Sequence, residues 1–239
     1  MTSEEKKNTL YLIPTPISRQ KKNYSLPNHT LEVVHSLDSF VVEKVQAAQS
    51  FLEWCGHPKP IHELLFRVLN RKTPEHEAIS FVNLLQQGNL GVISEAGMPG
   101  VADPGAILVQ MAHQQGFRVV PLVGPSSIFL ALSASGLSGQ TFSFHGYLPR
   151  QETRRNEKIQ QLERESLKLN STQIVMETPH RNMEMFSSLV GNLRRSTHLC
   201  IASGITSGEE WIRTKRVADW RDAEKPELRK VPALFLFQT

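Results

Sequence analysis

The sequence GVISEAGMPGVADPG at residues 91–105 decides the fold more than any other stretch of this chain. An apolar run at residues 90–93 leads into a loop that contains three glycines and two prolines, and a helix-like segment at residues 106–114 follows at once. Open α/β sheets place ligands at such loops, beyond the carboxyl ends of parallel strands. We therefore expect a buried parallel strand with a ligand-binding loop. A tight turn that binds nothing is the alternative.

A second unit of the same kind follows about twenty residues later. Residues 119–123 form an apolar run, and Gly124-Pro125-Ser126-Ser127 begins another helical segment. Two strand–loop–helix units so close together predict one shared small-molecule site. Taken alone, residues 124–127 fit a plain helix cap equally well. The prolines at residues 14–16 fit a simple strand stop after the apolar run 9–13.

The order of elements predicts an α/β protein with two α/β domains. The first domain, residues 1–122, has alternating strands and helices and a parallel sheet. The second domain, residues 123–239, mixes hairpin-like strands with helices, which predicts a mixed sheet. Because no Ser/Gly-rich linker separates the domains, we expect a site in the cleft between them. The expected strands are residues 9–13, 40–42, 90–93, 119–123, 141–146, 173–176, 198–203 and 231–237, and the expected helices are 31–37, 45–55, 74–87, 106–114, 152–169 and 182–192, with 210–217 a strand or a helix start.

Composition indicates an ordinary cytoplasmic globular protein. The 239 residues are 39% hydrophobic and 21% charged, and no apolar run approaches the roughly 20 residues of a membrane span. We expect no membrane association and no secretion signal in the polar start, residues 1–7. Cys55 and Cys200 lie far apart among apolar neighbours and are expected to be buried thiols. No Cys/His spacing predicts a metal site.

The net charge of +4 permits a polyanionic partner without requiring one. Between Arg150 and Lys168, six basic residues alternate with four glutamates, which indicates a solvated helix face. Arg19, Lys21 and Lys22 are different, because no acid lies near them. They are the better candidates for a phosphate contact, with a flexible surface loop as the alternative.

Four segments in a fixed order resemble one family. They are LYLIPTPI at residues 10–17, SEAGMP with DPG at 94–105, VPLVGPSS at 120–127, and ETPHR at 177–181. Together they resemble the S-adenosylmethionine-dependent methyltransferases of the tetrapyrrole methylase superfamily, and within it the bacterial ribosomal RNA (cytidine 2′-O) methyltransferases. The resemblance implies a homodimer of two-domain α/β chains that bind the cofactor in a folded shape between the domains.

The resemblance also implies roles for matching residues. Pro16 closes the first strand against the cofactor, and Glu95 stands where relatives carry an acid. The other implied cofactor contacts are backbone from Gly97, Met98 and Pro99, hydroxyls from Ser126 and Ser127, and an opposite wall of Met176, Glu177, Ala202 and Ala233. Amides at a helix start suit the carboxylate of S-adenosylmethionine, and acids suit its amine and ribose hydroxyls.

Methyl transfer is an in-line displacement, in which positioning supplies much of the rate. A hydroxyl nucleophile must also lose its proton. We expect Glu177, His180 and Arg181 to be the catalytic group, and the base could be Glu177, His180, Glu43 or Asp103. Each has a structural alternative: His180 and Arg181 could cap a helix and form ion pairs, Asp103 could hold an Asx turn, and Glu43 could pair with Lys44 or another basic neighbour.

One segment departs from the family pattern. The ribosomal group carries Ala-Glu-Asp-Thr-Arg after the second strand, and this chain has Val42-Glu43-Lys44-Val45-Gln46. Glutamine cannot replace the bidentate grip of arginine on phosphate. The leading hypothesis is a methyltransferase acting on RNA, at a ribose 2′-hydroxyl of ribosomal RNA or on the ribosomal subunit. The alternatives are methylation of a small molecule such as a tetrapyrrole, and a non-catalytic regulatory protein that binds S-adenosylmethionine.

Overall fold

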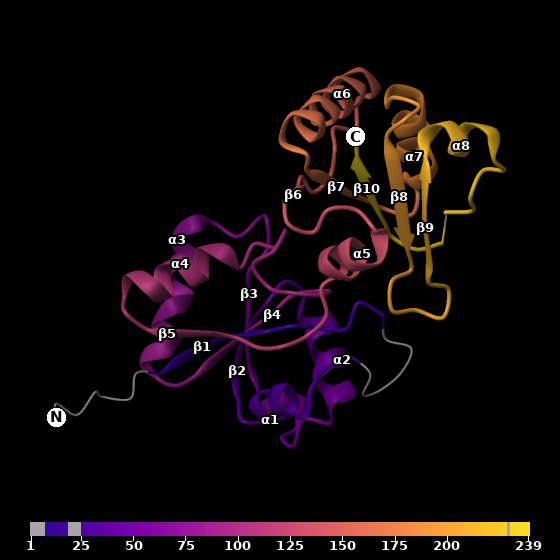
Figure 1. The fold of residues 1–239 in the computed structure, drawn as a ribbon. Helices are drawn as coiled ribbons and strands as arrows, with labels where there is room; N and C mark the ends of the chain where they lie inside the picture. Colours follow the sequence, from indigo (N-terminus) through magenta and orange to yellow (C-terminus); the bar gives the residue numbers. More distant parts are fainter. Residues whose placement is uncertain (1–7, 19–24, 229) are drawn as a thin grey trace. The chain divides into compact units, whose positions relative to one another are not determined.

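The computed structural model describes residues 8–18, 25–228 and 230–239 (Figure 1). The chain divides into two compact units, Met1–Ser126 and Ser127–Thr239, and each is described by itself. This division and the boundary expected after residue 122 both fall between a strand that ends at Pro121 and a helix that starts at Ser127. The expectations for Arg19, Lys21, Lys22 and residues 1–7 concern positions outside the described residues.

The first unit is built on a parallel five-stranded sheet in the order β3-β2-β4-β1-β5. All four residues of β4 are buried, as expected for a strand covered on both faces. Pro121 cannot donate a ladder hydrogen bond, and it lies in the edge strand β5. The strands are β1 (Thr9–Ile13), β2 (Ser39–Val42), β3 (Leu65–Val68), β4 (Leu90–Ile93) and β5 (Arg118–Pro121).

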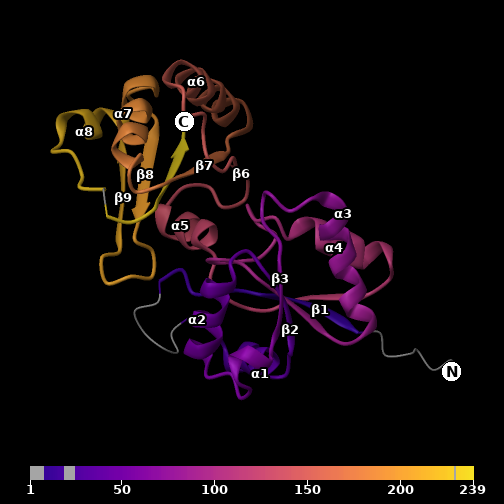
Figure 2. The ribbon, with the colours of Figure 1, turned by 180° about the vertical axis from the view of Figure 1, so that it is seen from behind.

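Helices cover both faces of this sheet (Figures 1 and 2). Phe40 and Val42 pack into the apolar cluster that includes α2, whereas Val41 between them packs into the cluster that includes α4. This alternation follows from the two-residue period of a strand. The helices are α1 (Asn28–His35), α2 (Val45–Cys55), α3 (Glu75–Ser80) and α4 (Ala106–Gln114), with 3-10 turns at Ile61–Glu63 and Phe81–Gln86. The single helix expected at residues 74–87 is thus wrong, because it ends at Ser80 and continues as a 3-10 helix.

The second unit contains a mixed sheet in the order β6-β7-β10-β8-β9. Only the β6–β7 pair is parallel. The strands are β6 (Phe142–Phe144), β7 (Thr172–Glu177), β8 (His198–Ser203), β9 (Trp211–Arg216) and β10 (Ala233–Gln238). The helices are α5 (Ser127–Ser135), α6 (Glu152–Leu169), α7 (Asn182–Asn192) and α8 (Val217–Asp222). The predicted α/β class, with one parallel and one mixed sheet, is confirmed.

The solvated face expected for residues 150–168 is only partly correct. Arg154 and Arg164 are exposed, but Arg155 is 1% exposed and Glu163 is also buried. These two residues lie on the buried stripe of α6 with Ile159, Leu162 and Ser166. The helical period places them there, and each finds polar partners. Glu163, for example, accepts hydrogen bonds from the Arg194 amide (2.7 Å) and the Thr197 hydroxyl (2.6 Å).

Both cysteines are free thiols, with Cys200 buried and Cys55 half-buried. Burial raises the pKa of the Cys55 thiol to about 12. Within residues 8–18, 25–228 and 230–239, no helix combines the length and apolar character needed to cross a bilayer.

We predict that Gly91→Ala destabilises the first unit. A Cβ on Gly91 would lie 2.6 Å from Ile13 Cδ1 and 2.9 Å from Phe40 Cδ1, inside a packed core. Overpacking of this kind costs about 1–3 kcal/mol of unfolding free energy. Gly88→Ala is the matched control, since nothing lies within 4 Å of its Cβ position. Chemical unfolding followed by circular dichroism measures both, and equal stability of the two variants would contradict the packing described.

Candidate functional site

The loops after β1 and β4 are fastened together by backbone hydrogen bonds. The Thr15 amide donates to the Gly97 carbonyl (2.9 Å), and the Gly97 amide donates to the Thr15 carbonyl (3.0 Å). The Thr15 hydroxyl donates to the Ser94 carbonyl (3.3 Å), and the Ser94 hydroxyl donates to the Gly97 carbonyl (3.2 Å). Because β1 and β4 are parallel neighbours, their loops leave the same sheet edge and can form this bridge.

The loop after β5 packs against the same bridge. Gly97 has φ +74°, and a Cβ there would lie 3.7 Å from the Pro125 carbonyl oxygen. At Gly124 a Cβ would lie 2.2 Å from Pro14 Cγ, so only glycine fits against this proline ring. The two loops that the sequence singled out, after β4 and after β5, therefore lie together at the carboxyl edge of the sheet.

This bridge changes what the predicted residues can offer a ligand. The amide and carbonyl of Gly97 are already hydrogen-bonded to Thr15, so the Gly97 amide cannot donate to a ligand. Because Gly97 has no side chain, a ligand could still approach its backbone closely. Pro16 and Pro99 are buried beside the bridge, and Met98 is half-buried. Asp103 Oδ1 accepts hydrogen bonds from the amides of Gly100 (3.2 Å) and Gly105 (2.8 Å), which is the Asx-type turn named as its alternative.

An ion pair joins the loop after β2 to the loop after β4. Lys44 Nζ lies 2.5 Å from Glu95 Oε1, and this hydrogen bond with its charge raises the pKa of Lys44. Lys44 thus pairs with Glu95, and the pair of Glu43 with Lys44 considered from the sequence is not formed. Burial raises the pKa of Glu43, and the nearby carboxylates of Glu95 and Asp103 raise it further, against Lys44 and Arg71.

Ser126 and Ser127 lie where α5 begins, and both are half-buried. Among the described residues, neither hydroxyl has a hydrogen-bond partner. The Glu95 side chain is 39% exposed. Within the first unit, Glu95 and Ser126 therefore offer a carboxylate and a free hydroxyl to a ligand.

The expected second wall is divided between two faces of the second sheet. Met176, Leu234 and Ala202 are paired across β7, β10 and β8, so their side chains share a face. Glu177 and Ala233 are paired one residue further on, and therefore point to the opposite face. Ala233 belongs to the apolar cluster beneath α6 and α7. The side chains of the four expected residues cannot form one surface, and Ala233 has only its backbone to offer on the face of Met176.

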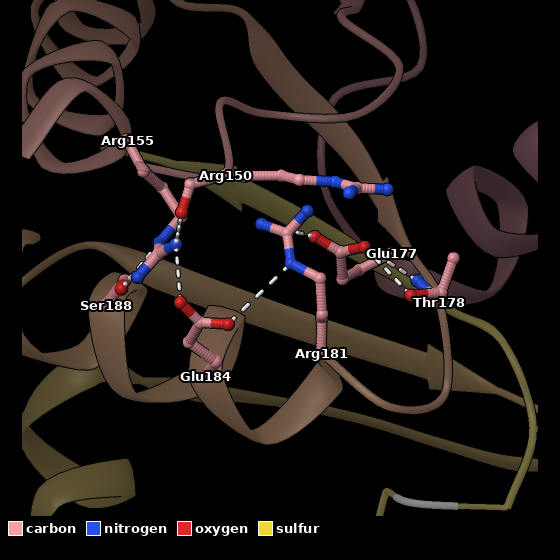
Figure 3. Close-up of polar contacts among 7 residues, drawn as sticks. All are labelled: Arg150, Arg155, Glu177, Thr178, Arg181, Glu184 and Ser188. Atoms are coloured by element: carbon pink, nitrogen blue, oxygen red, sulfur yellow. Dashed lines mark hydrogen bonds and ion pairs between the residues drawn. The ribbon is translucent and has the colours of Figure 1, made fainter. Parts of the chain in front are cut away.

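Glu177 ends β7 as a buried carboxylate (Figure 3). It is 1% exposed, and its Oε1 accepts hydrogen bonds from the Thr178 amide (2.8 Å) and hydroxyl (3.3 Å). Its Oε2 lies 3.2 Å from Arg181 Nη2, but this ion pair lacks hydrogen-bond geometry and Oε2 has no hydrogen bond. His180 is exposed and, within the described part of the chain, has no polar partner.

A chain of ion pairs continues from Arg181 to a buried arginine (Figure 3). Arg181 Nε lies 3.6 Å from Glu184 Oε2, and Glu184 Oε1 lies 2.8 Å from Arg155 Nη1. Arg155 also donates to the Ser188 hydroxyl (2.9 Å) and the Arg150 carbonyl (3.0 Å). Arg155 thus ties α6 to α7 and to the loop before α6. Sequence reasoning missed it, although its spacing from Ile159 and Leu162 already placed it on the apolar stripe.

In the part of the chain that the structure describes, no group of three or more His, Cys, Asp or Glu side chains is arranged to hold a metal ion.

Comparisons with known proteins agree on one family. The family model described as Tetrapyrrole (Corrin/Porphyrin) Methylases matches residues 26–219. Ribosomal RNA small subunit methyltransferase I of Vibrio cholerae is 30% identical over 210 residues, 88% of this chain and 69% of that protein. The Escherichia coli O157:H7 protein of the same name is 30% identical over 212 residues, 88% of this chain and 70% of that protein.

Solved structures share the fold. The methyltransferase CobJ has a TM-score of 0.62 at 15% identity, covering 97% of this chain and 93% of its own. A diphthine synthase has a TM-score of 0.62 at 14% identity, covering 96% and 89%. At such identities the likeness concerns the fold alone.

We predict that Arg155→Ala lowers the unfolding free energy by about 1.5–3 kcal/mol, because it removes charge-assisted hydrogen bonds from a buried site. Arg154→Ala, the exposed neighbour in the same helix, should stay within about 0.5 kcal/mol of the wild type. Chemical unfolding measures both. If the two variants lose the same stability, Arg155 is not the tie between α6 and α7.

We also predict a pH-dependent effect of Glu43→Gln. A folded-state pKa above the ordinary 4.5 means that the folded protein binds more protons than the unfolded chain in this pH window, so Glu43 lowers stability as the pH rises. The variant should therefore gain stability relative to the wild type at pH 7 compared with pH 4. Denaturant titrations at both pH values measure this, with Glu53→Gln as a control for removing an exposed carboxylate. A pH-independent difference would contradict it.

Proposed function

Because the chain belongs to the tetrapyrrole (corrin/porphyrin) methylase family, we propose that it transfers the methyl group of S-adenosylmethionine to small-subunit ribosomal RNA, at a ribose 2′-hydroxyl. The relatives named for ribosomal RNA methylation align with 88% of the chain. The observation that carries the proposal is the Thr15–Gly97 bridge, which gathers three loops at the carboxyl edge of a parallel sheet.

The residues at this edge fit S-adenosylmethionine. Glu95 offers acceptor oxygens for its amine or ribose hydroxyls. Ser126, Ser127 and the first amides of the nine-residue α5 offer donors for its carboxylate. Gly97, Met98, Pro99 and Pro16 would shape the adjoining wall. When bound, the cofactor supplies an electrophilic methyl group on a sulfonium.

We propose distinct roles for the three expected catalytic residues. Glu177 and Arg181 form an ion pair that fixes the loop after β7, so they act as positioning residues. His180, exposed on that loop, is the group free to accept a proton from the attacking hydroxyl. Asp103 is a poorer base, because both its hydrogen bonds hold the loop after β4.

One observation favours a second candidate, a regulatory protein that binds S-adenosylmethionine without catalysis. Lys44 neutralises Glu95, and Gln46 stands where the family motif places an arginine. Methyl-transfer assays with labelled S-adenosylmethionine separate the two candidates. Label in the small ribosomal subunit supports the enzyme, whereas cofactor binding with no labelled product in any cellular fraction supports the regulatory protein.

We predict micromolar binding of S-adenosylmethionine in isothermal titration, weakened about five- to tenfold by Ser126→Ala, since one hydrogen bond contributes about 1 kcal/mol. Ser50→Ala, an exposed serine in α2, is the matched control and should bind like the wild type. Absence of binding by a folded protein would overturn the proposal.

A further inference from the structure

A pocket of about 400 Å³ in the second unit has no role in the proposed methyl transfer. Ser203 at the end of β8 and Trp211 at the start of β9 form one side of it, and the other side comes from Pro226, Glu227, Leu228, Lys230 and Val231. Ser203 and Trp211 are paired across the strands, so their side chains share a face. Polar groups reach it from Glu209, Glu227 and Lys230.

The walls of this pocket are held in place by packing and hydrogen bonds. Trp211 meets Trp220 edge-on, with ring centroids 6.1 Å apart. Asn182, fully buried at the start of α7, donates to the carbonyls of Leu228 (2.7 Å) and Val231 (2.8 Å) and so anchors the opposite wall. The pocket is therefore pre-formed, which lowers the entropic cost of binding.

One polar group in the pocket lacks a partner. Ser203 is 5% exposed and lines the cavity, yet its hydroxyl has no hydrogen bond with any described residue. This hydroxyl can therefore donate a hydrogen bond to a ligand in the pocket or accept one from it. With an aromatic ring nearby and two carboxylates, which can only accept hydrogen bonds, the pocket favours a flat ligand that carries N–H donors, such as a nucleobase with an exocyclic amino group.

Positive charge continues along β9 from this pocket. Arg213 and Lys215 lie two and four residues beyond Trp211, so all three share one face of the strand. Both are exposed, and within the described residues neither has an ion pair. Lys215 Nζ lies 5.0 Å from the Trp220 ring centroid. An aromatic platform followed by cations on a sheet edge is the arrangement that binds single-stranded nucleic acid.

We propose that this pocket binds one unpaired nucleotide of an RNA, with the base against Trp211 and the adjoining phosphates along Arg213 and Lys215. The carboxylates of Glu209 and Glu227 accept hydrogen bonds from the amino group of the base and so disfavour uracil. This inference rests on the proposed function for the RNA class of the substrate, and it adds the surface that holds the strand.

Fluorescence titration of the full chain tests this, with short single-stranded oligomers of cytidylate and of uridylate and without S-adenosylmethionine. Cytidylate and uridylate differ in the base by an amino group against a carbonyl, so cytidylate should bind about fivefold more tightly or better. Trp211→Leu should weaken binding of cytidylate by about five- to hundredfold. Glu209→Gln with Glu227→Gln should remove the preference between the two oligomers.

The cations have their own matched test. Arg213→Ala with Lys215→Ala should weaken both oligomers and reduce the slope of log K against log salt by about 0.7 per lost contact. Arg164→Ala with Lys168→Ala removes the same charge from exposed positions of α6 and should leave the slope unchanged. Because Arg213 and Lys215 are exposed, the Arg213→Ala, Lys215→Ala double variant should keep the wild-type circular dichroism spectrum, even if the Trp211→Leu variant unfolds.

The outcomes separate this site from the methyltransferase proposal. Oligomer binding that depends on Trp211, Arg213 and Lys215 supports the pocket even if no methyl transfer is found. If the wild type transfers methyl groups but substitution of these three residues does not change oligomer binding, the proposed nucleotide pocket is overturned. The methyltransferase proposal then still stands. Equal binding of cytidylate and uridylate overturns the base-recognition part.

Discussion

The backbone bridge between Thr15 and Gly97 is the constraint on which the site in the first unit depends. Parallel pairing of β1 with β4 delivers both loops to one edge, and the bridge then fixes their separation. It occupies the amide and carbonyl of Gly97 with backbone hydrogen bonds, so the Gly97 amide is not free to donate to a ligand. Gly124 extends the arrangement, because it lets the loop after β5 lie directly on Pro14.

Charge at this edge is balanced by a residue that departs from the family motif. Lys44 reaches from the loop after β2 to Glu95, where Glu43 and Asp103 would otherwise add uncompensated repulsion. Because Lys44 pairs with Glu95, less negative charge is available there to a bound cation. The matched regions span about 70% of the curated relatives, which are longer than the matched part of this chain. The pocket beside Trp211 is one surface of this chain that bears on the choice of acceptor.

The second unit uses the two faces of one sheet for different purposes. On the face under α6 and α7, Glu177 begins a series of ion pairs that ends at the buried Arg155. Such a network stabilises a fold when every charge is partnered, and here each charge has a close ion pair, although Oε2 of Glu177 makes no hydrogen bond. Further along the same row of residues, Ser203 and Trp211 form the pocket. Met176 and Ala202 lie on the other face.

The sequence by itself determined most of the elements, because hydrophobic period and glycine or proline punctuation act over a few residues. It placed α2, α4, α6 and α7 with the bounds observed, and it identified both loops of the first unit. It could not determine the partners of charged side chains, since these come from distant strands. The Lys44–Glu95 pair, the occupied backbone of Gly97 and the burial of Arg155 were therefore decided by the tertiary structure. The tertiary structure also decided which strands lie beside Glu177 and Met176, because pairing with β10 and β8 joins residues that are distant in the sequence.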